Sequence, residues 1–99
     1  MYTRKATIAA SVGLHARPAA VFVRAVNRTG LPITLAKKGQ SPVDARSLLA
    51  VMSADFECGT EVLIGVEHTE ASEEAVTTAV DALAELLLSD LVDQPLKPA

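Results

Sequence analysis

The chain has 99 residues, which is the size of one common domain with a hydrophobic core. Apolar residues make up 49% of it and only 3% is aromatic, so the core must consist mainly of small aliphatic side chains. The formal net charge of −3 excludes a protein that binds nucleic acid through its overall charge.

Positive charge is concentrated in the first half of the chain. The lysines and arginines before residue 50 are Arg4, Lys5, Arg17, Arg24, Arg28, Lys37, Lys38 and Arg46. Most of the acidic residues lie in the second half. This asymmetry predicts a locally basic face that meets an acidic partner.

The single cysteine, Cys58, has no partner for an internal disulfide and no neighbours at metal-ligand spacing, and we interpret it as a small apolar residue. The chain does not open with a charged segment followed by an apolar signal region. It also contains no run of about 18 apolar residues. We therefore expect a soluble, unprocessed cytoplasmic protein that does not insert into membranes and holds no metal.

The first predicted elements are a strand and a helix joined by a short connection. Residues 2–9 have the β-prone, interspersed pattern of a strand. Residues 10–14 connect it to a helix over residues 16–28, which Thr29 and Gly30 end. The basic residues Arg17, Arg24 and Arg28 share one face of this helix. The apolar residues of the opposite face are Ala19, Phe22, Val23 and Val26.

The middle of the chain predicts a hairpin and a short second helix. Residues 32–37 alternate as a strand, residues 38–39 form a tight turn, and residues 40–44 return as a short strand. Because Pro42 has no N–H to donate, the returning strand is expected at the edge of the sheet. Ser47 precedes an apolar stretch and is expected to cap a short helix.

The last strand and the last helix have the clearest patterns. Residues 61–66 alternate as a strand. Residues 71–88 predict a helix, because apolar side chains recur on one face and glutamates occupy the first turn, where the helix dipole favours them. We expect one domain over residues 1–88 and a frayed tail over residues 89–99.

These elements follow the order β-α-β-β-α-β-α. Antiparallel strands with helices on one face make a two-layer α+β sandwich the expected fold class. The periodicity supports this class but does not determine the order of the strands.

One histidine, His15, stands where the first helix begins. Gly13 permits backbone conformations that other residues resist, and Pro18 is tolerated in the first turn of a helix. The unpaired N–H groups of that turn and the positive end of the helix dipole meet beside His15. The sequence therefore predicts an anion site with an imidazole and, from Arg17, a guanidinium beside it.

Residues 13–19, Gly-Leu-His-Ala-Arg-Pro-Ala, resemble the active-site motif of the HPr family, the histidine-containing phosphocarriers of the bacterial sugar phosphotransferase system. Residues 46–53 resemble the family's serine motif. The resemblance extends over roughly residues 2–88. It implies an open-faced β-sandwich, in which a four-stranded antiparallel sheet of order 1-4-2-3 carries three helices on one side.

The resemblance implies that His15 accepts phosphate from enzyme I, which is itself phosphorylated by phosphoenolpyruvate. His15 then donates the phosphate to the enzyme IIA components of sugar permeases. The phosphate is expected on Nδ1 of His15, in contact with Arg17. The N–H groups of Ala16 and Arg17 would stabilise it, and Arg17 would add bidentate hydrogen bonds. The protein would then be a monomeric carrier rather than an enzyme, and it would need no cofactor.

Partners have to approach His15 closely, and two helix ends supply a candidate surface if they meet as in the family. The candidates for an exposed apolar patch are Ala20, Leu48, Leu49 and Met52. At least one of the three residues from the second helix is expected in the core. Arg24, with Arg28, would supply a basic rim, and such a surface suits a transient interface shared by several partners.

Ser47 has two interpretations. As an N-cap it needs no further role. It also matches the serine that a dedicated HPr kinase phosphorylates in some family members, where the added charge weakens docking of enzyme I. This chain departs from that pattern, because Ala54 stands where a larger aliphatic residue is common and one extra residue precedes the serine. His68 is expected to be an exposed residue at the end of a strand.

Other functions stay open at this point. A paralogous carrier could serve a nitrogen-regulatory or fructose-specific branch, and a regulatory module with the same fold could act by docking alone. Loss of the histidine would mark a module that acts by docking alone, and His15 is present. An unrelated module could bind a metabolite anion on the basic face of the first helix. The sugars and permeases served, and any role of residues 89–99, do not follow from the sequence.

Overall fold

The computed structural model describes residues 2–67 and 69–89. Its elements are β1 (Thr3–Thr7), α1 (Ala16–Thr29), β2 (Ile33–Lys37), β3 (Val43–Asp44), α2 (Leu48–Ser53), β4 (Glu61–Val66) and α3 (Glu73–Leu87). The predicted order of strands and helices is confirmed. His68 and the predicted tail beyond Ser89 lie outside the described residues.

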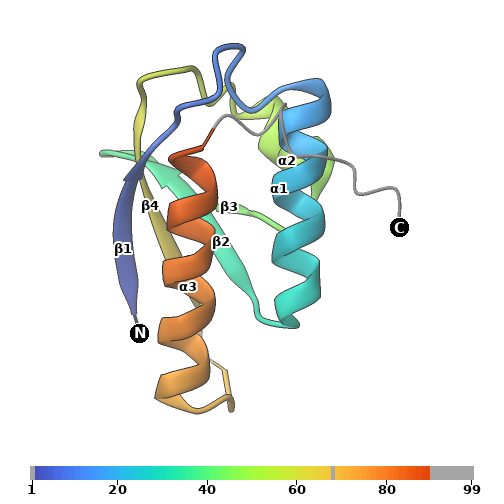
Figure 1. The fold of residues 1–99 in the computed structure, drawn as a ribbon. Helices are drawn as coiled ribbons and strands as arrows, with labels where there is room; N and C mark the ends of the chain where they lie inside the picture. Colours follow the sequence, from blue (N-terminus) through green and yellow to red (C-terminus); the bar gives the residue numbers. More distant parts are fainter. Residues whose placement is uncertain (1, 68, 90–99) are drawn as a thin grey trace.

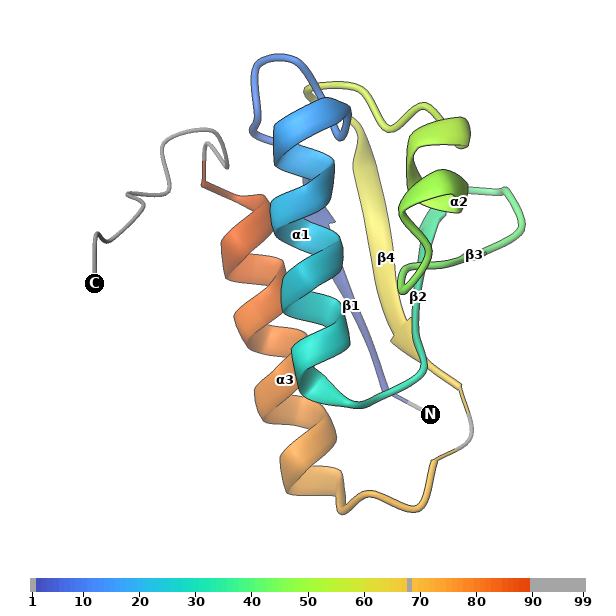
Figure 2. The ribbon, with the colours of Figure 1, turned by 90° about the vertical axis from the view of Figure 1, so that its right-hand side faces the viewer.

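The four strands form one antiparallel sheet in the order β1-β4-β2-β3, with α1 and α3 side by side across one face (Figures 1 and 2). In its register, Leu63 of β4 pairs with Lys5 of β1 on one side and with Ala36 of β2 on the other. The α+β class is therefore confirmed, together with the strand order that the family resemblance implied.

Alternation along the strands decides which side chains enter the core. In β4, Val62, Ile64 and Val66 are buried beneath the helices, whereas Glu61 and Leu63 are exposed on the open face. The side chain of Leu63 is the apolar exception, and the residue is 38% exposed.

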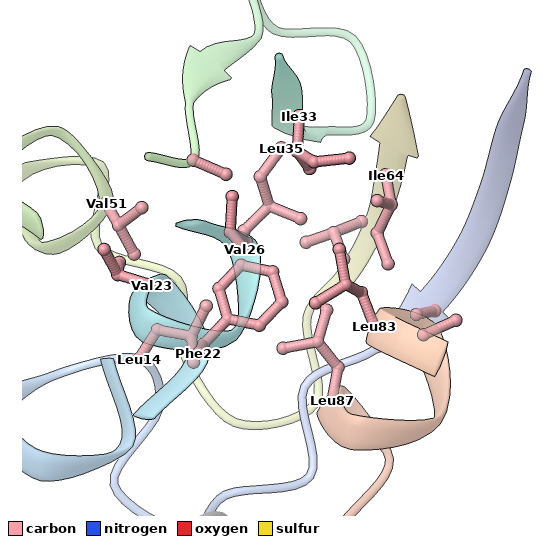
Figure 3. Close-up of a cluster of buried hydrophobic side chains, with 14 of the residues drawn as sticks. Leu14, Phe22, Val23, Val26, Ile33, Leu35, Val51, Ile64, Leu83 and Leu87 are labelled. Carbon is pink, nitrogen blue, oxygen red and sulfur yellow. The ribbon is translucent and has the colours of Figure 1, made fainter. Parts of the chain in front are cut away.

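The core lies between the sheet and the helices, and every layer contributes to it. Figure 3 shows side chains from the helices, the strands and the loop before α1 converging on one interior. Fully buried members include Leu14, Phe22, Val26, Ile33, Leu35, Val51, Phe56, Ile64 and Leu87. Two aromatic rings thus sit among aliphatic side chains, which agrees with the composition.

The first helix follows the sequence prediction closely. Its buried residues include Ala19, Phe22, Val23 and Val26, and its arginines are exposed. Gly30 ends it in the left-handed conformation with φ of 71°, which a residue without Cβ adopts at little cost. No helix of the described residues is long and apolar enough to cross a membrane.

Several predicted boundaries are too generous. The first strand ends at Thr7 instead of residue 9. The returning strand is only Val43–Asp44, because Pro42 cannot donate to a ladder, although its position at the sheet edge is confirmed. The last helix begins at Glu73, where the hydroxyl of Ser72 accepts a hydrogen bond from the Ala75 N–H at 3.1 Å.

A charged pair joins the end of β3 to the linker that precedes α2. The Nε and Nη2 atoms of Arg46 donate to the two carboxylate oxygens of Asp44 at 2.9 and 3.1 Å. This bidentate hydrogen bonding lowers the pKa of the Asp44 carboxyl below its ordinary value. The side chain of Asn27 in α1 also donates to the Arg46 carbonyl at 3.2 Å. The linker between β3 and α2 is therefore bonded both to β3 and to α1.

Replacing Phe22 by alanine should destabilise the protein by about 3–5 kcal/mol, because the ring is fully buried and leaves a cavity. Leu49→Ala is the matched control. Leu49 is 77% exposed, so its loss should change the free energy of unfolding by no more than about 0.5 kcal/mol. Urea denaturation of both variants measures the difference, and equal effects would contradict the assigned core.

Candidate functional site

His15 occupies the N-cap position of α1, at the end of the molecule where the loop before the helix turns (Figure 2). Its backbone is extended, with φ of −129° and ψ of 155°, and its side chain makes no capping hydrogen bond. The preceding residue, Leu14, is fully buried. The ring is thus presented at the surface next to an anchored residue.

The loop that carries His15 is fastened to the loop between α2 and β4. The Leu14 N–H donates to the Phe56 carbonyl at 2.7 Å. Gly13 has φ of +74°, and a Cβ at this position would lie 2.5 Å from the same carbonyl oxygen. Glycine is therefore required here both for its backbone conformation and for the space it leaves.

The fastened loops bring His15 beside Asp55. The Nε2 atom of His15 lies 3.0 Å from Oδ1 of Asp55, and the two side chains are 38% and 58% exposed. Asp55 was not among the site residues predicted from the sequence. The only local signal is its place just after a helix end, where aspartate is among the few residues that enter the left-handed region readily.

The predicted anion-binding groups gather at the first turn of α1. The N–H groups of Ala16 and Arg17 donate to no acceptor within the described residues. Arg17 is exposed and forms no ion pair in that part of the chain. Two amide donors, a guanidinium and an imidazole therefore stand at one helix end, where the helix dipole favours negative charge.

The predicted apolar patch lies on α2, which packs against α1. Leu48 and Leu49 are 41% and 77% exposed, whereas Met52 is partly buried against the core. Ala20 of α1 is also partly buried. Arg24 and Arg28 lie exposed on α1, as the rim prediction requires.

The expectation that one of Leu48, Leu49 and Met52 belongs to the core is met only by the partial burial of Met52. The fully buried residue of α2 is Val51. The reason is the rotation of the helix about its axis. In a helix of six residues only one side chain points fully into the core, and in α2 that side chain is Val51.

Ser47 acts as the predicted N-cap of α2. Its hydroxyl oxygen accepts a hydrogen bond from the Ala50 N–H at 3.1 Å. The structural role is therefore confirmed, and phosphorylation of Ser47 stays a prediction.

The remaining candidates for a functional site are a cysteine, a metal cluster and a hollow in the surface. Cys58 is a free, exposed cysteine with its sulfur 3.9 Å from the Ala9 carbonyl oxygen, and its interpretation as a small apolar residue without chemistry stays a prediction. Among residues 2–67 and 69–89, no three His, Cys, Asp or Glu side chains gather to hold a metal ion. A hollow of about 550 Å³ lies elsewhere, lined by residues that include Tyr2, Thr69 and Val76.

Known proteins resemble this chain over most of its length. A family described as "PTS HPr component phosphorylation site" matches residues 2–89. Phosphocarrier protein HPr of Streptomyces coelicolor is 38% identical over 95 residues, covering 96% of this chain and 97% of that protein. HPr-like protein Crh of Bacillus subtilis is 38% identical over 76 residues, covering 74% of this chain and 88% of that protein. The crystal structure of a phosphocarrier protein HPr from Bacillus anthracis has a TM-score of 0.72 at 32% identity, covering 86% of this chain and 94% of that one.

Substituting Gly13 by alanine should cost more stability than the same change at Gly39. Both residues have positive φ, so each alanine pays about 1–2 kcal/mol for a left-handed backbone. Only Gly13→Ala also meets a carbonyl oxygen, which adds about 1–3 kcal/mol of overpacking, because a Cβ at Gly39 meets nothing within 4 Å. Chemical denaturation of the two variants tests this, and equal losses would show that the close approach to Phe56 is absent.

Proposed function

The chain belongs to the HPr family, the phosphocarriers of the phosphotransferase system, and from that membership we propose a specific relay. His15 accepts a phosphoryl group from phosphorylated enzyme I and passes it to enzyme IIA components of sugar permeases in the cytoplasm. The observation that carries the proposal is the exposed imidazole at a helix N-terminus, inside the segment that matches the family.

The residues around His15 suit a reversible transfer. Imidazole is both an adequate nucleophile and a good leaving group, which a carrier needs in turn. Phosphoryl transfer depends on positioning and charge stabilisation more than on covalent help from other side chains. The N–H groups of Ala16 and Arg17, which have no acceptor among the described residues, are available to the phosphoryl group, and the Arg17 guanidinium can add two parallel hydrogen bonds.

The surface next to His15 suits short-lived docking. Leu48 and Leu49 expose apolar area on α2, and Arg24 lies exposed on the neighbouring α1. An apolar centre with a charged rim is the composition of interfaces that form and dissociate quickly. We propose that a monomer presents this patch, made of Ala20, Arg24, Leu48, Leu49 and Met52, to enzyme I and to the enzyme IIA components in turn.

The relatives also leave room for a regulatory paralogue, because one of them is an HPr-like protein rather than a named phosphocarrier. The presence of His15 favours the carrier over a docking-only module. Phosphorylation of Ser47 by an HPr kinase would place a doubly charged group beside Leu48 and Leu49, where it would oppose docking.

Phosphoryl transfer can be tested with enzyme I from the same organism and radiolabelled phosphoenolpyruvate. The wild-type protein should take up one phosphoryl group in an acid-labile, base-stable bond, as expected for phosphohistidine. His15→Ala should take up none, whereas Leu63→Ala, changed on the open face of the sheet, should be labelled normally. Absence of label on the wild type, or full label on His15→Ala, would reject the proposal.

Leu49→Ala should weaken docking without changing the fold. Loss of an exposed apolar contact in an interface is worth about 1 kcal/mol, which corresponds to a roughly fivefold higher KM of enzyme I for this protein. Leu63→Ala is the control, since it removes the same side chain from the open face of the sheet. Steady-state phosphorylation kinetics measure both, and equal KM values for the two variants would place the docking surface elsewhere.

A further inference from the structure

Two residues other than glycine have positive φ in the described part of the chain, and both adjoin His15. Ala16, the next residue along, has φ of +50°, and Asp55, whose carboxylate contacts the ring, has φ of +60°. Left-handed backbone is unfavourable for residues with a Cβ, although aspartate tolerates it better than most. Such conformations cluster at functional sites.

The contact between Asp55 and His15 determines which ring nitrogen is free. An ionised carboxylate only accepts hydrogen bonds, so Nε2, at 3.0 Å from Oδ1, must carry the proton of the neutral ring. The lone pair is then on Nδ1. Nδ1 has no hydrogen-bond partner among residues 2–67 and 69–89.

We propose that Asp55 is a positioning residue for phosphoryl transfer at His15. It holds the ring in the form protonated at Nε2, presents the Nδ1 lone pair to the donor, and offsets the charge that the ring acquires. This inference rests on the proposed function, since it assigns a role within the same transfer.

The step shows why a carboxylate at this position helps. The Nδ1 lone pair attacks the phosphorus of the phosphorylated donor and forms an N–P bond. The bond from phosphorus to the donor's leaving atom breaks, and its electron pair stays on that atom. Nε2 keeps its proton, so the ring becomes an N-phosphorylated imidazolium with one positive charge. The Asp55 carboxylate stabilises that charge, as the aspartate of a Ser-His-Asp triad stabilises its imidazolium. Onward transfer reverses the sequence.

The backbone keeps the pair together. Leu14 and Phe56, the neighbours of His15 and Asp55, are buried and joined by the 2.7 Å hydrogen bond between their backbones. The side chains of both functional residues are partly exposed, which limits the strength of their interaction. A rate effect of about two- to fivefold is what an exposed pair supports.

The first test is the tautomer of His15, read from the ¹⁵N NMR shifts of its ring in the unphosphorylated protein. At a pH where the ring is neutral, the wild type should be almost entirely protonated at Nε2. Asp55→Gly should show a larger fraction protonated at Nδ1. Its fold should be as stable as the wild type or more stable, because glycine adopts a φ of +60° freely. Glu57→Gln, which removes a charge from an exposed residue of the same loop, should leave the tautomer unchanged.

The second test is the rate of phosphoryl transfer from enzyme I, measured by rapid quench. Asp55→Gly should react about two- to fivefold more slowly, and Glu57→Gln should match the wild type. Asp55→Asn keeps an accepting oxygen and tolerates the backbone, but lacks the charge, so it should also be slower than the wild type. An unchanged tautomer in Asp55→Gly, or an unchanged rate, would overturn the role of Asp55 while the proposed function stands. A wild-type protein that takes up no phosphate would instead overturn the proposed function and, with it, the role in transfer.

Discussion

The hydrogen bond from the Leu14 N–H to the Phe56 carbonyl is the contact on which the site depends. It joins two loops through residues that are themselves buried, and it requires the missing side chain of Gly13. The exposed residues His15 and Asp55 stand one position outside this contact. The core therefore supplies the rigidity, and the surface supplies the chemistry, as an efficient functional site requires.

The elements of the fold could be predicted because each carries a local signal. Burial alternates along residues 61–64 and recurs at helical spacing in α1, and Ser47 and Gly30 mark helix ends by their own chemistry. The length of β3 could not be predicted in this way. Pro42 limits where this strand can begin, but how far Val43 and Asp44 stay paired with β2 is a property of the sheet.

The residues of the site differ in the same way, because some carry a local sequence signal and others do not. His15 and Arg17 lie two positions apart in a recognisable motif. Asp55 is 40 positions from His15 and belongs to no motif that would indicate a role at the site. Only the packing of the two loops brings them together. The burial of Val51 in place of its apolar neighbours has a similar origin, since five apolar residues among the six of this short helix leave its rotation undetermined until the helix meets the core.

The pairing of β1 with β4 has a consequence for folding during synthesis of the chain. β1 and the His15 loop are made before their partners, which are β4 and the Phe56 carbonyl. On the ribosome, the Leu14 N–H cannot reach the Phe56 carbonyl until residue 56 has left the exit tunnel, and β1 has no complete partner strand until residue 66 has left it. Contacts between such distant segments form late in folding. The nascent chain is thus synthesised without its histidine site and acquires it together with its sheet.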